Sequence, residues 1–421
     1  MQMNISRAKG TKDIFFDDMK IWEYVEENIK DICLKHNINQ IRTPIFEDTT
    51  LFSRSVGDET DIVNKEMYTF LDKGNRSITL RPELTAGVVR AYIENGFSSM
   101  PTPIKLWYIG TMYRYEKMQK GRYREFSQFG IEVFGSDSYL ADIEVISVAN
   151  ELFKKLKLTD SIALKINSIG CTVCRAKYID TLKEYLADKI ENMCDDCKTR
   201  YVKNPMRIID CKQDKCKSAK QNLPMITDYL CDDCSKDFES LKSTLSEVGI
   251  EYEIDKTIVR GLDYYNKTVF EFISKDLGLA VGGGGRYDTL VEVLGGTHTP
   301  AIGFGLGMDR IILLLKENNL VSNPKNVDVY FTVFNSNIFP KVYKLINDLR
   351  DLGYIIDIDI CNRSFNAQMK YANKIKAKYI CIIGEDELEE KVCSLKNMNT
   401  SQQVKVKMLA EEIDNILKGG N

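Results

Sequence analysis

Residues 113–135 read YRYEKMQKGRYREFSQFGIEVFG, and they follow a segment at 104–113 in which apolar residues alternate. Alternation of this kind predicts a strand at 104–113, and the apolar residues at 131–134 predict a second one. Gly110 and residues 121–123 interrupt the pattern between the two. We therefore predict two antiparallel strands joined by a long basic loop.

The basic loop carries Arg114 and Arg122, and Phe126 follows it. A guanidinium is always charged and can hold phosphate or carboxylate oxygens with two parallel hydrogen bonds. An aromatic ring such as that of Phe126 can stack on a flat base. The hairpin is therefore a candidate anion site, although composition alone favours a solvated basic hairpin.

Two other stretches place an arginine near glycines. Residues 259–265 read VRGLDYY, which suits a polar pocket wall because tyrosine offers an apolar body and a hydrogen-bonding tip. A turn leading into a strand at 268–272 explains this stretch equally well. Residues 301–316 begin as a glycine-spaced strand, AIGFGLG, and become a helix, MDRIILLLK, with Arg310 in its first turn. Helix N-termini favour anions, but spaced glycines often just permit tight packing.

The composition is that of a soluble protein with more than one domain. The 421 residues are 43% hydrophobic and 28% charged, with a net charge of -3. Two or three domains are expected, and any nucleic-acid partner must be bound by local basic patches.

We find no apolar run of membrane-spanning length and no signal peptide at residues 1–10, so we expect a cytoplasmic protein without a membrane partner. His36 and His298, the only histidines, are too far apart for HExxH.

The spacing of apolar residues predicts a helix at 18–36, capped by Asp17 or Asp18 and ending near Asn37. Pro44 predicts an extended segment at 41–46. A linker is indicated by Pro324 and Asn326. After it, strands at 327–333, 354–360 and 378–383 alternate with helices at 339–352, 365–377 and 407–417. This alternation predicts a small α/β domain with a largely parallel sheet.

The sequence contains no GxxxxGK[ST] phosphate loop, and neither residues 282–285 nor the glycines at 303, 305 and 307 fit GxGxxG. If ATP binds this chain, arginines must hold its phosphates. The three arginine-bearing stretches described above could supply them.

Taken together, these stretches resemble the histidyl-tRNA synthetases, a family of class II aminoacyl-tRNA synthetases. Residues 113–135 resemble the family's motif 2, IVRGLDYYNKTVFEF at 258–272 its histidine-specific signature, and GFGLGMDR at 303–310 its motif 3. Further matches are GGRYDTLVEVLGG at 284–296, LRPELTAG at 80–87 and the segment around Pro44, which corresponds to motif 1. The resemblance extends from Arg7 to Lys418.

The resemblance implies an α+β class II catalytic domain built on an antiparallel sheet over residues 1–325. It implies a helical, cysteine-rich insertion at about 171–248 and a C-terminal α/β anticodon-binding domain at 326–421. The implied reaction activates L-histidine with ATP to histidyl-adenylate and pyrophosphate, then transfers histidine to the 3′ end of tRNA(His). ATP would be a substrate and Mg²⁺ would bridge its phosphates. A homodimer is expected, with the segment around Pro44 at its interface.

The resemblance also implies residue roles. Arg114 and Arg260 would be catalytic, with Arg260 stabilising charge on the α-phosphate as histidine's carboxylate attacks. ATP would be bound by Arg114, Glu116, Arg122, Phe126 and Arg310. Histidine would be bound by Glu83, Thr85, Arg114, Gln128, Glu132, Arg260, Tyr264 and Tyr265, with Glu132 and Tyr264 at the two imidazole nitrogens. Candidate tRNA contacts are Gln119, Lys120 and Arg124, and in the C-terminal domain Arg363, Gln368 and Lys370, where a solvated polar face is an equal alternative.

Eight of the twelve cysteines lie between residues 171 and 234. In a reducing cytosol they indicate metal ligation or free thiols rather than disulfides. They are Cys171, Cys174, Cys194, Cys197, Cys211, Cys216, Cys231 and Cys234. Three CxxC pairs and one looser pair supply enough thiolates for two tetrahedral zinc sites. We expect at least one structural zinc, which the resembling family does not generally need; the pairing stays open and reduced thiols are the alternative. The remaining cysteines, expected in apolar cores, are Cys33, Cys361, Cys381 and Cys393.

Two other functions were weighed against this interpretation. The synthetase-like regulatory subunit of ATP phosphoribosyltransferase shares the fold without charging tRNA, but it usually lacks the anticodon domain and part of the arginine set. Arg114, Arg260 and Arg310 are all present here. A class II synthetase for proline, threonine or glycine is disfavoured by the RGLDYYN stretch.

Overall fold

The computed structural model describes residues 5–57, 60, 62–320, 326–334 and 337–419. The chain divides into two compact units, Met1–Ser322 and Asn323–Asn421. Of the predicted linker, Pro324 lies outside the described residues, and Asn326 has no regular secondary structure. Among the described residues, no helix has both the length and the apolar character needed to cross a membrane.

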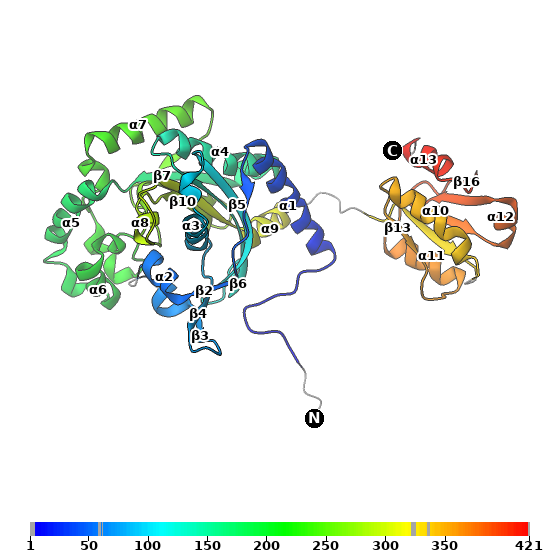
Figure 1. Cartoon of the computed structure of the whole chain (residues 1–421), viewed down its shortest axis with the longest axis horizontal. Helices are drawn as coiled ribbons and strands as arrows, with labels where there is room; N and C mark the ends of the chain where they lie inside the picture. The colour runs from blue at the N-terminus through cyan, green and yellow to red at the C-terminus, as the bar shows by residue number, and fades with distance from the viewer. Residues whose placement is uncertain (1–4, 58–59, 61, 321–325, 335–336, 420–421) are drawn as a thin grey trace. The chain divides into compact units, whose positions relative to one another are not determined.

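An eight-stranded sheet forms the centre of the first unit, in the order β1-β5-β6-β11-β10-β9-β7-β8 (Figure 1). β5 (Ile104–Tyr113) and β6 (Glu125–Phe134) pair antiparallel along their whole length. The antiparallel pattern continues through β11 (Ala301–Gly307), β10 (Ala280–Arg286), β9 (Asn266–Ser274) and β7 (Ile162–Ser168). The short edge strands β1 (Asn39–Gln40) and β8 (Glu253–Ile254) pair parallel. The predicted hairpin and antiparallel sheet are confirmed.

The two faces of this sheet are covered by separate hydrophobic cores. On one face, α1 (Asp17–Lys35), α4 (Tyr139–Lys155) and α9 (Met308–Glu317) bury apolar residues with Trp107 and Ile131 of the sheet. On the other face, α3 (Thr85–Glu94) packs with Tyr108 and Phe134. Successive strand residues point to opposite faces, so the neighbours Trp107 and Tyr108 enter different cores.

Helix α1 confirms the helix predicted at 18–36 to within one residue at each end. Its predicted cap is wrong, because Phe16 is the N-cap residue and makes no side-chain cap hydrogen bond. Asp17 and Asp18 instead lie in the first turn, where carboxylates stabilise a helix through its dipole. Asn37 follows the helix with a positive φ of 53°.

A three-stranded antiparallel sheet lies beside the large one and follows Pro44 in the sequence. It contains β2 (Phe46–Asp48), β4 (Ser77–Leu80) and β3 (Tyr68–Leu71), in the order β2-β4-β3. Helix α2 (Thr49–Val56) begins after β2, and Asp48 caps it by accepting a hydrogen bond from the Thr50 N–H at 2.9 Å. A short π-helix at Ile62–Glu66 and α8 (Leu290–Val293) complete this side of the unit.

The cysteine-rich segment is helical, as expected. It forms α5 (Thr172–Leu186), α6 (Asp195–Lys203) and α7 (Asp232–Glu247), with short 3-10 turns between them. In Figure 1, α5 and α6 lie at the side of the first unit away from α1 and α9. Tyr178 and Leu182 of α5 share a hydrophobic core with Val88 of α3 and with Val259. The segment is therefore packed into the same unit as the large sheet.

The second unit contains a five-stranded sheet in the order β13-β12-β14-β15-β16. β12 (Val329–Val333), β13 (Ile356–Ile358) and β14 (Tyr379–Ile383) are parallel, whereas β15 (Val392–Asn397) and β16 (Gln403–Lys407) are antiparallel. Its helices are α10 (Phe339–Asp351), α11 (Phe365–Lys374), α12 (Glu385–Glu390) and α13 (Ala410–Gly419). The α/β character is confirmed, but α12, β15 and β16 were not predicted, and Lys407 ends a strand rather than starting the last helix.

Candidate active site

A cavity on the α3 side of the large sheet gathers residues from distant parts of the chain. Its walls come from the loop between β5 and β6, the start of α3, the loop before β9 and the start of α9. The three arginine-bearing stretches therefore meet in one place. The predicted site residues that line this cavity are Glu83, Thr85, Arg114, Glu116, Arg122, Phe126, Gln128, Arg260, Tyr264, Tyr265 and Arg310.

Strands β6 and β11 shape the cavity through alternation and glycine. Gln128 lines the cavity, and Glu132 lies on the same strand face four residues further along. Across the pairing, Gly303 of β11 is opposite Glu132. A Cβ at Gly303 would stand 1.8 Å from a Glu132 carboxylate oxygen, and a Cβ at Gly130 would stand 2.4 Å from the Tyr108 hydroxyl. The glycines on these strands leave space for polar side chains beneath the cavity.

Glu132 is completely buried and lies behind the cavity wall rather than on it. Its carboxylate accepts hydrogen bonds from the hydroxyls of Thr85 at 2.8 Å and Tyr108 at 3.0 Å, and from that of Tyr287. Burial raises the pKa of Glu132 to about 8, although these three hydroxyls oppose the shift. Because Thr85 and Tyr108 line the cavity, two hydroxyls connect the buried carboxyl to it.

Glu83 is buried at the start of α3. Its carboxylate accepts hydrogen bonds from the backbone N–H groups of Thr85 at 2.7 Å and Ala86 at 2.8 Å. A carboxylate at this position satisfies backbone donors that have no partner within the helix. Burial raises the pKa of Glu83, while the two N–H groups and Arg114 act in the opposite direction.

Arg114 and Phe126 form the part of the cavity nearest the basic loop. The Arg114 side chain donates a hydrogen bond to the carbonyl of Pro82 at 2.7 Å, and its guanidinium lies 5.4 Å from the centroid of the Phe126 ring. Glu116 accepts a hydrogen bond from Arg122 at 2.9 Å and lies 3.7 Å from Arg114. One carboxylate therefore keeps two guanidinium groups close together.

Arg310 lies in the first turn of α9, as predicted. It donates to the carbonyl of Gly121 at 3.3 Å and to that of Ala280. Burial and the neighbouring Arg122 lower the pKa of Arg310, as expected where guanidinium groups share a confined space. This concentration of positive charge favours an anionic ligand.

Arg260 is held by a carboxylate on the neighbouring strand. Its guanidinium donates to Glu271 of β9 at 2.5 Å and lies 5.7 Å from the centroid of the Tyr265 ring. Burial is the largest single effect and disfavours its charge, but Glu271 together with Tyr265 and Tyr264 raises the pKa of Arg260. Among the residues that the structure describes, none accepts a hydrogen bond from the buried Arg260 Nε, so this donor remains for a ligand in the cavity.

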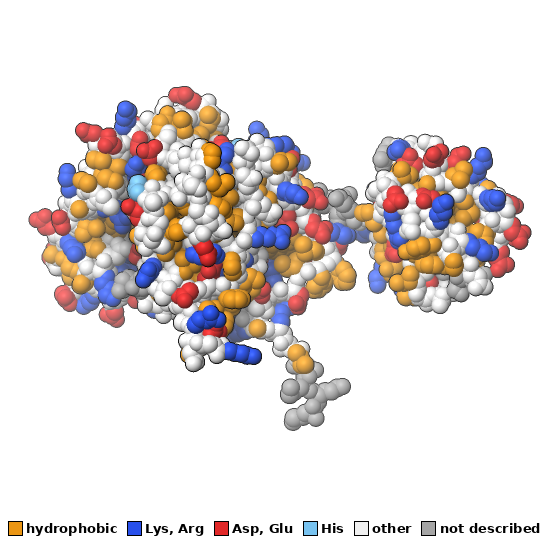
Figure 2. All heavy atoms as spheres, in the orientation of Figure 1, with side chains coloured by type: hydrophobic (Ala, Val, Ile, Leu, Met, Phe, Trp, Pro, Cys, Tyr) orange, Lys and Arg blue, Asp and Glu red, His pale blue; other side chains and the backbone are white. Residues whose placement is uncertain are grey.

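The candidate tRNA contacts of the first unit lie in the loop between β5 and β6. Gln119 forms an isolated bridge with Arg122, and Lys120 pairs with Glu317 of α9. The Arg124 guanidinium lies 3.6 Å from the centroid of the Tyr115 ring. The loop is therefore fastened to α9 by this ion pair and by Arg310, which donates to the Gly121 carbonyl. On the face that Figure 2 shows, basic and acidic side chains intermingle on both units.

In the second unit, Arg363 pairs with Asp359 at 3.0 Å, and Lys370 is exposed. Gln368 is buried, and its carboxamide accepts a hydrogen bond from the Val333 N–H at 3.0 Å and donates to the Val333 carbonyl at 2.8 Å. The prediction that Gln368 contacts tRNA is wrong, because its side chain is used to connect α11 to β12.

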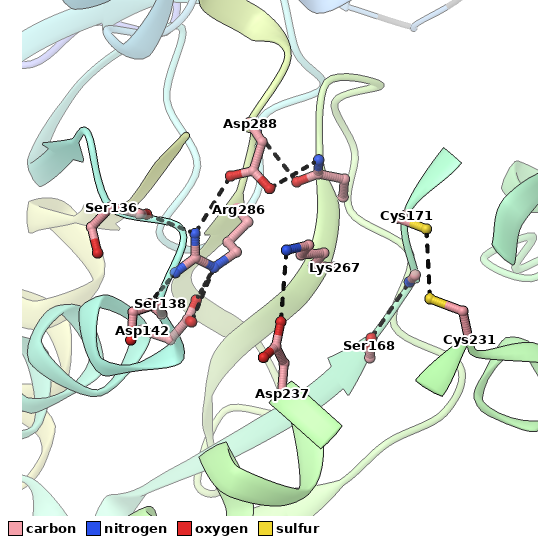
Figure 3. Close-up of polar contacts among 12 residues, drawn as sticks. Ser136, Ser138, Asp142, Ser168, Cys171, Cys231, Asp237, Lys267, Arg286 and Asp288 are labelled. Carbon is pink, nitrogen blue, oxygen red and sulfur yellow. Dashed lines mark hydrogen bonds and ion pairs between the residues drawn. The ribbon is translucent and has the colours of Figure 1, made fainter. Parts of the chain in front are cut away.

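The eight cysteines of the helical segment gather into two groups of four. One group is Cys171, Cys174, Cys231 and Cys234; the other is Cys194, Cys197, Cys211 and Cys216. In each group all the sulfur atoms lie within 4.8 Å of one another. Figure 3 shows the first group's thiols of Cys171 and Cys231 facing each other, 3.9 Å apart. Sulfur atoms about 2.3 Å from one zinc ion would stand about 3.8 Å apart, so both groups fit a tetrahedral ion.

The other cysteines lie outside these groups. Cys33, Cys381 and Cys393 are buried, as predicted. Cys361 is exposed, so its predicted place in a core is wrong. It lies in an irregular loop after β13, which ends at Ile358, and the preceding Ile360 is also exposed, so the buried pattern of the strand does not continue to Cys361.

Several supporting residues were not predicted. In the sequence, Tyr108 and Tyr287 resemble ordinary aromatic residues of a core. The structure shows that their hydroxyls donate hydrogen bonds to the buried Glu132. Arg286 of the GGRYD stretch is buried and donates to Asp142 and to the Ser136 carbonyl, both at 3.0 Å (Figure 3). A charged residue in an otherwise apolar or glycine-rich strand, such as Arg286 at the end of β10 or Glu271 within β9, was the available signal, since buried charges need partners.

The sequence matches two family models, one described as Histidyl-tRNA synthetase over residues 10–311 and one as Anticodon binding domain over residues 327–418. A histidine–tRNA ligase of Clostridium novyi is 49% identical, covering 96% of this chain and 97% of that protein. One of Acetivibrio thermocellus is 50% identical, covering 95% and 96%. The crystal structure of apo Staphylococcus aureus histidyl-tRNA synthetase has a TM-score of 0.82 at 36% identity and covers 99% of both chains.

Proposed function

The chain belongs to the histidyl-tRNA synthetase family and is a histidine–tRNA ligase, and from that premise we propose how its cavity divides between histidine and ATP. In the first step a histidine carboxylate oxygen attacks the α-phosphorus of ATP, and pyrophosphate leaves. In the second step a hydroxyl of the terminal ribose of tRNA(His) attacks the activated carbonyl, and AMP leaves. The observation that supports this division is the meeting of three arginine-bearing segments around one cavity.

We propose that ATP binds at the end of the cavity formed by the basic loop and α9. Arg114, Arg122 and Arg310 would hold the phosphates, and Phe126 would stack on adenine. Confined guanidinium groups and a lowered pKa of Arg310 are what a polyanion site requires. Mg²⁺ takes oxygen ligands and would be held chiefly by the phosphates, with Glu116 as a carboxylate of the same wall.

We propose that histidine binds between the start of α3, β6 and the loop before β9. Glu83, Thr85 and Gln128 would hold its amino and carboxylate groups, and Tyr264 and Tyr265 would flank the ring. Glu132 would accept a hydrogen bond from one imidazole nitrogen after displacing a hydroxyl partner, since Thr85 and Tyr108 lie between it and the cavity. A buried acceptor left unpaired by an isosteric amino acid gives strong discrimination.

We propose that Arg260 is catalytic, because it has a buried unpaired Nε and a position fixed by Glu271. It would stabilise the negative charge that develops on the α-phosphate. In ATP–pyrophosphate exchange, Arg260→Ala should lower kcat at least 100-fold while histidine still binds in calorimetry. Arg76→Ala, which removes an exposed arginine paired with Asp72, is the control. An unchanged exchange rate in Arg260→Ala would refute the catalytic role.

We propose that residues 1–325 are the catalytic domain and 326–421 the anticodon-binding domain of a cytoplasmic enzyme. Gln119, Lys120 and Arg124 would meet the acceptor end of tRNA(His), and Arg363 the anticodon. The same exchange assay across amino acids tests the overall assignment. Exchange with histidine alone supports it, whereas no exchange with any amino acid would favour the regulatory subunit of ATP phosphoribosyltransferase.

We propose that the enzyme is a homodimer whose interface includes the three-stranded sheet. Phe46 of β2 is 60% exposed and Leu71 of β3 is 65% exposed, and Ile45 and Phe70 nearby are also exposed. Clustered exposed apolar side chains mark interaction surfaces. Sedimentation equilibrium measures the mass directly, and a monomer at micromolar concentration would contradict the proposal.

We propose that the insertion at about 171–248 binds zinc. Two groups of four cysteines with closely spaced sulfurs support this. Backbone N–H groups also point at sulfur, with Cys231 N–H donating to Cys174 at 3.1 Å and Cys194 N–H donating to Cys216 at 3.3 Å. Elemental analysis of protein purified without chelator should find up to two zinc ions per chain. Protein that contains no zinc would contradict the proposal.

A further inference from the structure

The segment that bears Arg260 has little regular structure of its own. Residues 258–265 lie between β8 and β9 and belong to no helix or strand. Asn167 of β7 donates to the Ile258 carbonyl at 3.0 Å, and the Asp263 N–H donates to the Val56 carbonyl at 3.3 Å. We call residues 258–265 the arginine loop. Its position depends on side chains from elsewhere, because it makes few backbone hydrogen bonds.

Three side chains of the cysteine-rich segment hold the arginine loop. Arg207 donates to the carbonyl of Arg260 itself at 2.9 Å. Asn204 donates to the Asp263 carboxylate at 2.9 Å. Arg175 donates to the Tyr265 carbonyl at 3.0 Å. The Arg260 side chain is held by Glu271, so the cysteine-rich segment supplies the contact that holds its backbone.

Each of these three residues lies close in the sequence to members of a cysteine group. Asn204 is the residue that ends α6, whose first turn carries Cys197, and Arg207 lies in the 3-10 turn Pro205–Ile208. The Cys211 N–H then donates to the Ile208 carbonyl at 3.0 Å. Asn204 and Arg207 therefore stand between two cysteines of one group. Arg175 follows Cys174 of the other group directly in the sequence.

We propose that the two metal centres position the arginine loop for catalysis, the Cys194–Cys216 centre through Asn204 and Arg207 and the Cys171–Cys234 centre through Arg175. This inference rests on the zinc proposed above. A bound ion fixes four thiolates that would otherwise repel one another and closes the chain segments between them. With the ion present, the donors from Asn204 and Arg207 meet the arginine loop in one geometry. Arg207 is then a positioning residue and Arg260 the catalytic one.

The main test replaces Arg207 without touching a cysteine. Arg207→Gln should retain both zinc ions and lower kcat of ATP–pyrophosphate exchange about tenfold, with the KM for ATP little changed, because a charged donor to the Arg260 carbonyl is lost. Arg207→Lys keeps the charge and one donor and should recover part of kcat. Lys198→Gln is the control, since it removes a cation of the same segment that pairs with Glu191 instead. Hydrogen exchange at residues 259–265 should increase in Arg207→Gln and stay at the wild-type level in Lys198→Gln.

A second test removes one metal centre. Cys211→Ser should lower the zinc content by one ion, raise hydrogen exchange at 259–265 and lower kcat by at least the factor seen for Arg207→Gln. If Cys211→Ser does not fold, the comparison of Arg207→Gln with Arg207→Lys still tests the positioning role of Arg207. Zinc-free wild-type protein would overturn the metal proposal itself. Two bound zinc ions, with exchange kinetics and hydrogen exchange of Arg207→Gln equal to those of the wild type, would overturn the positioning role alone.

Discussion

Replacing Glu132 with glutamine isolates the energetic effect of a completely buried carboxyl. The pKa of Glu132 is about 8 in the folded protein, against an ordinary 4.5. The folded protein therefore holds a proton that the unfolded chain has released. Its contribution to stability is complete below pH 4.5 and is lost as the pH rises to about 8. A difference of about 3.5 pH units corresponds to about 5 kcal/mol, or about 1.4 kcal/mol for each pH unit within this window.

Glutamine keeps the shape and an acceptor oxygen but cannot ionise. Both tryptophans, Trp22 and Trp107, lie in the first unit, so urea unfolding followed by tryptophan fluorescence reports on that unit. Between pH 5.5 and 7.5, the unfolding free energy of Glu132→Gln minus that of the wild type should rise by about 1.4 kcal/mol per pH unit. The exposed Glu251→Gln variant should follow the wild type. Parallel pH profiles for Glu132→Gln and the wild type would refute the reasoning.

Three further outcomes are expected. Phe126→Ala should raise the KM for ATP about tenfold in exchange and leave the KM for histidine unchanged, because stacking on a base contributes about 1–3 kcal/mol; equal changes in both would contradict adenine stacking. Gly303→Ala should abolish histidine activation or unfold the first unit, since its Cβ would overlap a Glu132 oxygen, and circular dichroism separates the two results. Phe46→Asp should yield monomers in sedimentation equilibrium, whereas an unchanged mass would remove β2 from the interface.

The sequence predicted the elements in which apolar residues or glycines recur at regular spacing. Helix α1, strand β5 and the β11–α9 connection lie within a few residues of their predicted bounds. The strand β6 is longer than predicted because Ser127 and Gln128, at its start, are polar residues on a site-lining strand. In the second unit, β16 was not predicted because most of its residues are exposed and two of its five are lysines.

The charged residues that line the site could be predicted from the sequence. Residues that only hold another site residue in place were harder to predict. Arg114, Arg260 and Arg310 were identified because glycines and tyrosines accompany them in the sequence. The hydroxyl of Tyr287 and the carboxylate of Glu271 act by contacts between segments that only the fold brings together. Gln368 shows the opposite error, because a polar residue on a helix was assumed to be solvated and is instead buried.

Strand β6 is synthesised well before β11, the strand with which it pairs. Glu132 and Tyr287, which share a hydrogen bond in the finished enzyme, are 155 residues apart in the chain. At 5–20 residues per second, a ribosome needs about 8–30 s to make the second after the first. Throughout that interval β6 lacks its β11 neighbour. Burial, which raises the pKa of Glu132, is therefore completed only after β11 has been synthesised.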